Sequence, residues 1–177
     1  MKNKESTPML VLVLGLISLV TAALLGYVNE ITEPKIAELK MAEQTAAFAS
    51  FFPDADHFDE ATLPDGSAAS AGYFAYDASG AEMGRIVLIA PTGFGGPIEM
   101  AIGFDENSAV SGFKILSLSE TSGVGTRVTE ESFWGQFIGK SSFEDVDTLT
   151  GATISSTAVL KGVNDAAAVA PQLAAQS

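Results

Sequence analysis

The fold is decided by residues 72–120, which read GYFAYDASGAEMGRIVLIAPTGFGGPIEMAIGFDENSAVSGFKILSLSE. Four segments in this stretch are rich in β-branched and aromatic residues and predict strands: 72–78, 83–92, 98–105 and 109–120. The connections ASGA, GFGGP and DENS have the composition of turns. Because a parallel crossover needs about a dozen residues or more, these short connections predict an antiparallel meander.

Helical patterns flank the strands on both sides. From Pro34 to about Phe52 the chain has good helix formers, with apolar residues at three- and four-residue spacing. Residues 129–140, TEESFWGQFIGK, predict a short helix with aromatic anchors, and an Ala/Val-rich segment predicts a helix from about Ser155 to Val169. The aromatic anchors of the short helix are Phe133, Trp134 and Phe137. The expected fold class is therefore α+β, an antiparallel sheet with packed helices.

An acidic segment, residues 53–70, separates the first helix from the strands and reads PDADHFDEATLPDGSAAS. Its carboxylates suggest calcium, but the EF-hand spacing and its central glycine are missing. We interpret it as a solvated surface loop.

An uncharged apolar run covers residues 9–28, MLVLVLGLISLVTAALLGYV. A helix of this length spans about 30 Å, the thickness of the hydrocarbon core, which predicts a single transmembrane helix. The alternative is a cleaved signal peptide with TAA at 21–23 as its small-residue site, although such an apolar core is usually shorter, about 7–15 residues. Lys2 and Lys4 precede the run, so residues 1–8 are expected in the cytoplasm and the chain after about Asn29 outside.

Composition removes several kinds of chemistry. The sequence has no cysteine, which excludes disulfides, zinc–thiolate sites and cysteine-ligated iron–sulfur clusters. The sequence has one histidine, His57, which makes a histidine-based triad or a His-rich metal site improbable. The net charge of -13 makes nucleic acid a poor partner. We assign no catalytic residue and no metal, and expect a cofactor to supply any chemistry.

Five hydroxyl side chains crowd at the start of the last predicted helix, within DTLTGATISS at 147–156: Thr148, Thr150, Thr153, Ser155 and Ser156. Ser and Thr are preferred helix N-caps, so one interpretation is capping. The exposed N–H groups and the positive dipole end of a helix also bind phosphate, and Gly151 allows close backbone approach. Capping and anion binding both remain open on the residues alone.

Two glycine-rich stretches do not match nucleotide-binding signatures. GVGTRV at 123–128 has Val128 where the third glycine of a dinucleotide fingerprint would stand. GFGGP at 93–97 lacks the Lys and Ser/Thr of a phosphate-binding P-loop and predicts a hairpin turn.

The hydroxyl-rich DTLTGAT, residues 147–153, resembles the flavinylation motif D-x-x-[ST]-G-A-T of FMN-binding domains in the RnfG and NqrC subunits of membrane redox pumps. GFGGPIEMAIGFD resembles the family's G-[YF]-G-G-P-I segment, ETSGVGTRV its E-T-P-G-L-G stretch, and FWGQFIGK the aromatic segment that follows. Order, spacing and the N-terminal anchor agree, and the compact length favours the RnfG branch. Ser122 and Val124 replace the usual Pro and Leu, which should change loop stiffness only.

The resemblance implies a covalent FMN, joined by a phosphoester to the Thr153 hydroxyl by an FMN transferase. The attachment signal would be Asp147, Thr150, Gly151, Ala152 and Thr153, with Asp147 read mainly by the transferase. The remaining cofactor-binding residues that the resemblance and the helix start imply fall into three groups. They are Ser155, Ser156 and, more weakly, Lys161 at the phosphate; Glu120 and Thr121 near the isoalloxazine ring; and Gly123 and Gly125, which keep that loop close. The GFGGP turn would lie near the same pocket.

The expected plan is a cytoplasmic N-terminus at 1–8, a transmembrane helix at 9–28, a connecting helix at 29–52 and an FMN-binding domain at 53–177. The resemblance implies a single-pass subunit of the cell (inner) membrane, with its FMN domain on the extracytoplasmic side.

The function implied is that of an electron-transfer subunit in an Rnf-type complex, which couples ferredoxin:NAD+ electron transfer to Na+ or H+ translocation. Expected partners are the other Rnf subunits, including a second covalent-FMN subunit, and the FMN transferase. The alternatives are an NqrC-type subunit of a Na+-pumping NADH:quinone oxidoreductase, a free-standing extracytoplasmic flavin carrier, or a non-redox module that binds an anion.

Overall fold

The computed structural model describes residues 7–175. The chain divides into two compact units, one ending at Ala42 and the other beginning at Glu43. The first unit consists of most of helix α1, and the second holds the sheet and every other helix of the described chain.

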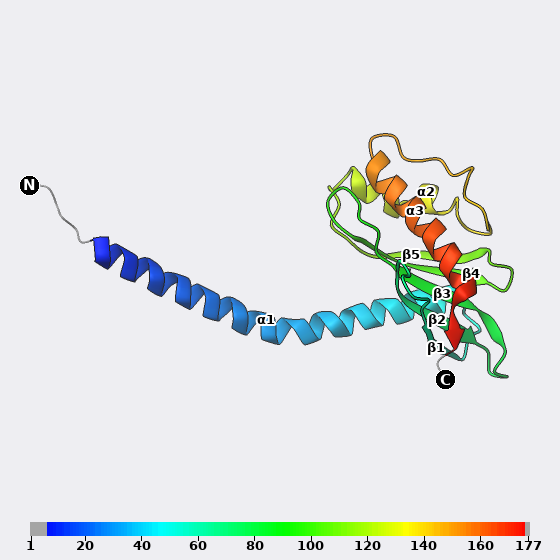
Figure 1. Ribbon diagram of the computed structural model, residues 1–177, viewed down its shortest axis with the longest axis horizontal. Helices are drawn as coiled ribbons and strands as arrows, with labels where there is room; N and C mark the ends of the chain where they lie inside the picture. Colours follow the sequence, from blue (N-terminus) through cyan, green and yellow to red (C-terminus); the bar gives the residue numbers. More distant parts are fainter. Residues whose placement is uncertain (1–6, 176–177) are drawn as a thin grey trace, which may run out of the picture. The chain divides into compact units, whose positions relative to one another are not determined.

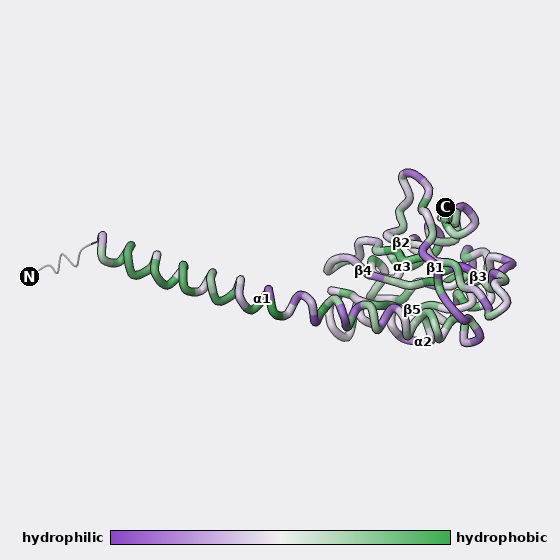
Figure 2. The backbone as a smooth tube through the Cα atoms, turned by 90° about the horizontal axis from the view of Figure 1, so that it is seen from below, coloured by the Kyte–Doolittle hydropathy of each residue, from purple (hydrophilic) through white to green (hydrophobic). Residues whose placement is uncertain are grey.

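Helix α1 runs without interruption over Thr7–Phe51. The sequence predicts two helices, at 9–28 and from Pro34, whereas the structure joins them. Pro34 lies inside this helix and has no N–H to donate, yet the helix continues through it. The first half of α1 is apolar and the second half mixed (Figure 2). Over residues 7–175, α1 is the single helix that is long and apolar enough to cross a membrane.

The second unit is built on a six-stranded antiparallel sheet in the order β5-β4-β3-β2-β1-β6 (Figure 1). The four predicted strands are present, and the predicted meander is confirmed. The strand bounds are β1 His57–Thr62, β2 Ala69–Tyr76, β3 Glu82–Ile89, β4 Ile98–Asp105, β5 Val110–Leu118 and β6 Ala174–Ala175.

The prediction of a loop over 53–70 is wrong in its middle, because β1 occupies His57–Thr62. Most of β1 is exposed, with Phe58 half-buried and Ala61 buried, so the strand lacks the apolar alternation that identifies strands in a sequence. Its partners are β2 on one side and β6, more than a hundred residues later, on the other.

Helices cover the two faces of this sheet. Helix α3, Thr153–Val169, packs on one face with the 3-10 helix η1, Gly125–Thr129, and the short helix α2, Glu131–Trp134 (Figure 1). A second 3-10 helix, η2 Ala170–Gln172, continues α3. The last turns of α1 pack their aromatic residues on the opposite face.

The helix predicted over 129–140 is shorter than expected, because only Glu131–Trp134 is α-helical and turns follow it. Phe133 and Phe137 are nevertheless fully buried, as their role as anchors requires, and Trp134 is half-buried against the core. Helix α3 begins two residues earlier than predicted, at Thr153.

Candidate functional site

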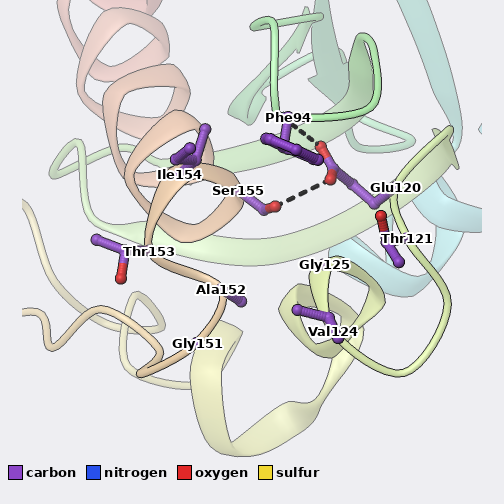
Figure 3. Close-up of a pocket in the computed structure, with 10 residues that line it drawn as sticks. All are labelled: Phe94, Glu120, Thr121, Val124, Gly125, Gly151, Ala152, Thr153, Ile154 and Ser155. Atoms are coloured by element: carbon purple, nitrogen blue, oxygen red, sulfur yellow. Dashed lines mark hydrogen bonds between the residues drawn. The ribbon is translucent and has the colours of Figure 1, made fainter.

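Three segments surround a pocket of about 410 Å³ at the N-terminal end of α3. Phe94 comes from the β3–β4 connection, four residues come from the chain after β5, and five come from the start of α3 and the loop before it (Figure 3). The residues after β5 are Glu120, Thr121, Val124 and Gly125; those at α3 are Gly151, Ala152, Thr153, Ile154 and Ser155. A volume of this size suits a small organic ligand or cofactor.

Glu120 connects the three segments. Its Oε1 accepts a hydrogen bond from the backbone N–H of Phe94 over 2.8 Å, and both carboxylate oxygens lie 3.3 Å from the backbone nitrogen of Gly95. The Ser155 hydroxyl donates to Oε2 over 3.0 Å, and Figure 3 shows Glu120 directed between Phe94 and Ser155. Glu120 therefore fixes the geometry of the pocket wall.

Glycines make this arrangement possible. A Cβ on Gly125 would lie 2.6 Å from Glu120 Oε2, 2.8 Å from Glu120 Cβ and 3.0 Å from Ser155 Oγ, and a Cβ on Gly93 would collide with Glu120 Oε1. Gly151 has a φ of +86°, a conformation that favours glycine over other residues. Gly93 and Gly125 are thus required by the close approach of Glu120, and Gly151 is favoured by its backbone conformation.

The start of α3 has no side-chain cap. Its N-cap residue is Ala152, and no side-chain hydrogen bond satisfies the first-turn N–H groups. Ser155 and Ser156 point their hydroxyls elsewhere, to Glu120 and to the carbonyls of Ala152 and Thr153. The capping interpretation of the hydroxyl cluster is therefore wrong, and the N–H groups at the helix start are left for another acceptor.

Seven of the predicted site residues line the pocket: Glu120, Thr121, Gly125, Gly151, Ala152, Thr153 and Ser155. The others lie outside its lining. Ser156 is fully buried, and its hydroxyl accepts the N–H of Leu149 over 3.1 Å. Lys161 forms an ion pair with Asp165 further along α3. Thr150 and Asp147 are exposed in the loop before α3, and Gly123 is exposed in the turn before η1.

Three pocket residues were not predicted as site residues: Phe94, Val124 and Ile154. They are large apolar side chains with 69%, 47% and 59% of their surface exposed. Phe94 belongs to the GFGGP turn, which was expected near the same pocket, and this expectation is confirmed. An unusual apolar residue between glycines is the one signal that could have singled it out.

Comparison with known proteins identifies the class of domain that contains the pocket. Residues 93–168 match the model of the FMN-binding domain, and this match spans all three pocket segments. Residues 1–50 match that of the RnfG N-terminal region. The pocket therefore belongs to a domain of the FMN-binding class.

Curated relatives extend the likeness to nearly the whole chain. The G subunit of the ion-translocating oxidoreductase complex of Methanosarcina acetivorans is 31% identical, over 93% of this chain and 94% of the relative. The G subunit of the proton-translocating ferredoxin:NAD(+) oxidoreductase complex of Clostridium ljungdahlii is 28% identical, over 83% and 82%. The chain belongs to the RnfG family, the G subunits of ion-translocating oxidoreductase complexes.

A third G subunit and one solved structure are also similar to this chain. The G subunit of the Na(+)-translocating ferredoxin:NAD(+) oxidoreductase complex of Acetobacterium woodii is 28% identical, over 86% of each chain. The crystal structure of Shewanella oneidensis NqrC is 18% identical, with a TM-score of 0.47 over 63% of this chain and 65% of that one.

Proposed function

We propose that this chain is the membrane-anchored electron-transfer subunit of an Rnf-type complex, which couples ferredoxin:NAD+ electron transfer to Na+ or H+ translocation. Family membership supports this, since two relatives are named as subunits of ferredoxin:NAD(+) oxidoreductase complexes. The chain is a relay within that enzyme and has no complete activity alone. Its partners are the other subunits, among them a second subunit with covalent FMN.

The position of Thr153 is the observation that supports this residue as the FMN attachment site. Thr153 is the first residue of α3, is exposed, and lies on the edge of the pocket next to Gly151 and Ala152. A hydroxyl at this place is open to an attaching enzyme. A phosphate on it would also lie beside the uncapped N–H groups and the positive dipole end of α3, which stabilise negative charge.

Formation of the bond needs an activated donor, because FMN itself carries an unactivated phosphate. The Thr153 oxygen bonds to the phosphorus of the FMN phosphoryl group in a flavin dinucleotide, as the phosphoanhydride bond of that donor breaks. The nucleoside monophosphate leaves with the bridging oxygen, and the Thr153 proton passes to a base on the FMN transferase. The side chain therefore needs only access and a hydroxyl.

The pocket residues have separate tasks toward FMN, which supplies electron transfer when it is bound. Phe94, Val124 and Ile154 provide apolar surface to cover the flat ring and exclude water. Glu120 and Ser155 hold the walls at a fixed separation through their hydrogen bond. Covalent attachment keeps the cofactor in place on an exposed domain in every redox state.

The membrane part acts as an anchor. Residues 9–28 of α1 carry no charged side chain, so ion passage is the task of partner subunits. The lysines at positions 2 and 4 favour a cytoplasmic N-terminus, which puts the FMN domain on the extracytoplasmic side. The proposed plan is then anchor at 9–28, connecting segment at 29–52 and FMN-binding domain at 53–177.

In-gel flavin fluorescence under denaturing conditions tests the proposal, after production with and without the FMN transferase. The wild-type band should fluoresce only with the transferase, and Thr153→Val should be dark. Thr148→Val is the matched control, since Thr148 is an exposed threonine in the same loop, and it should stay fluorescent. A wild-type band without flavin fluorescence in the presence of an active transferase would refute a covalent flavin.

A further inference from the structure

The loop before α3 is folded, although it has no regular secondary structure. Val146 and Ala152 are buried and Leu149 is half-buried against the core. These three residues are spaced by three, and the residues one position later, Asp147 and Thr150, are exposed. Thr153 continues the exposed series, so the polar residues of the attachment signal share the solvent side of the loop.

Two side chains from other segments hold this loop through its backbone. The Gln136 amide makes a pair of hydrogen bonds with Asp147: Oε1 accepts its N–H over 2.9 Å, and Nε2 donates to its carbonyl over 3.3 Å. Arg127 Nη1 donates to the carbonyl of Thr150 over 3.1 Å. Both contacts leave the side chains of Asp147 and Thr150 unused.

We propose that Gln136 and Arg127 are positioning residues, which fix the loop at 147–152 in the one conformation that the FMN transferase recognises. The proposal rests on attachment at Thr153. The transferase would read a folded surface, with the Asp147 carboxylate, the Thr150 hydroxyl and the Thr153 acceptor in a set arrangement, rather than an extended peptide. Without these contacts, ordering the loop costs conformational entropy at the moment of binding.

The test measures initial rates of covalent flavin incorporation into the full chain in detergent. The chain is purified from cells without the transferase and is then mixed with purified transferase and flavin adenine dinucleotide. Gln136→Leu removes both hydrogen bonds at similar volume, and we expect kcat/KM to fall about tenfold, mainly through KM. Gln136→Glu keeps the acceptor and loses the donor, so its rate should be intermediate. Arg127→Met should also raise KM.

Gln172→Leu is the matched control. Gln172 also donates its side-chain amide to a backbone carbonyl, that of Ala168 over 2.7 Å, but it lies in η2, which follows the C-terminal end of α3. It should react at the wild-type rate. Amide hydrogen exchange gives an independent readout: the Asp147 N–H should exchange faster in Gln136→Leu and unchanged in Gln172→Leu.

The outcomes separate the two proposals. Failure of the wild-type chain to accept flavin would refute covalent attachment itself. Wild-type kcat and KM in both Gln136 variants and in Arg127→Met, with flavin lost in Thr153→Val, would overturn only the positioning role. A raised KM in Gln136→Glu with an unchanged melting temperature supports positioning, even if Gln136→Leu destabilises the chain.

Discussion

Ser155 Oγ donates a hydrogen bond to Glu120 Oε2 over 3.0 Å, and this contact joins the first turn of α3 to the chain that follows β5. The same carboxylate accepts the backbone N–H groups of Phe94 and Gly95. One side chain thus sets the separation of three segments that are far apart in sequence. The Ser155 hydroxyl, which is expected at the phosphate, contacts Glu120 in the wall of the pocket.

Removal of this carboxylate should loosen the pocket. Glu120→Ala leaves the N–H groups of Phe94 and Gly95 and the Ser155 hydroxyl without their acceptor. We expect the free energy of unfolding to fall by about 1–3 kcal/mol and the Phe94 and Gly95 amides to exchange faster. Glu106→Ala, an exposed carboxylate in the β4–β5 turn, is the control and should change neither.

Two glycines of the same loop should respond differently to alanine. Gly125 is buried, and its added Cβ would press on Glu120 and Ser155, so we expect a loss of about 1–3 kcal/mol in stability together with weaker protection of the flavin. Gly123 has open space around it but a φ of +76°, so Gly123→Ala should cost about 1 kcal/mol through the backbone alone. If Gly125→Ala and Gly123→Ala expose the flavin to iodide quenching to the same extent, the steric role of Gly125 is contradicted.

The apolar wall should shield the attached cofactor. Phe94→Ala should raise quenching of flavin fluorescence by iodide, because an exposed ring that covers the pocket is lost. Stability should hardly change, since 69% of the Phe94 surface is exposed. Ile138→Ala removes a 41% exposed side chain outside the pocket lining and should leave quenching unchanged.

The β2–β3 turn should contribute a pH-dependent stability. The Ser79 hydroxyl, followed by the backbone N–H groups of Ala81 and Ser79, holds the pKa of Asp77 below its usual value. A lowered pKa in the folded state means that the stabilisation is present above the unfolded pKa, about 3.9, and is lost as pH falls through the folded value. Asp77→Ala should therefore be less stable than wild type at pH 7, and the difference should shrink in acid.

Urea unfolding of the detergent-solubilised chain at several pH values measures this effect. Asp145→Ala removes an exposed carboxylate outside the turn and is the control. A difference between wild type and Asp77→Ala that is constant with pH would contradict the assignment to the ionised carboxylate.

The meander was predictable because its signals are local. Strands β2 to β5 carry apolar and β-branched residues and are joined by short turns, so neighbours in sequence are neighbours in the sheet. Strand β1 was missed because most of its residues are exposed and its second partner, β6, lies at the far end of the chain. Tertiary pairing gives β1 its structure, and no pattern within 57–62 shows it.

The site was predictable only as far as its motifs reach. Glu120, Thr121 and the loop before α3 were placed through the family resemblance, and the structure brings them to one pocket. The direction of the Ser155 hydroxyl depends on Glu120, which comes from a distant segment, and could not be read from the sequence. The Ser156 hydroxyl contacts the backbone of Leu149, Ala152 and Thr153, and its direction depends on how the loop before α3 folds. Ile154 carries no local signal either, because an exposed apolar residue is common on any protein surface.

The most direct test of the central claim is the intact mass of the chain after production with the FMN transferase, followed by peptide mapping. We predict a mass increase of one FMN less one water, located on the peptide that contains Thr153, and no increase in Thr153→Val. Thr153→Ser should retain it, since the hydroxyl is kept. An unmodified wild-type chain, or a flavin that persists in Thr153→Val, would contradict the account.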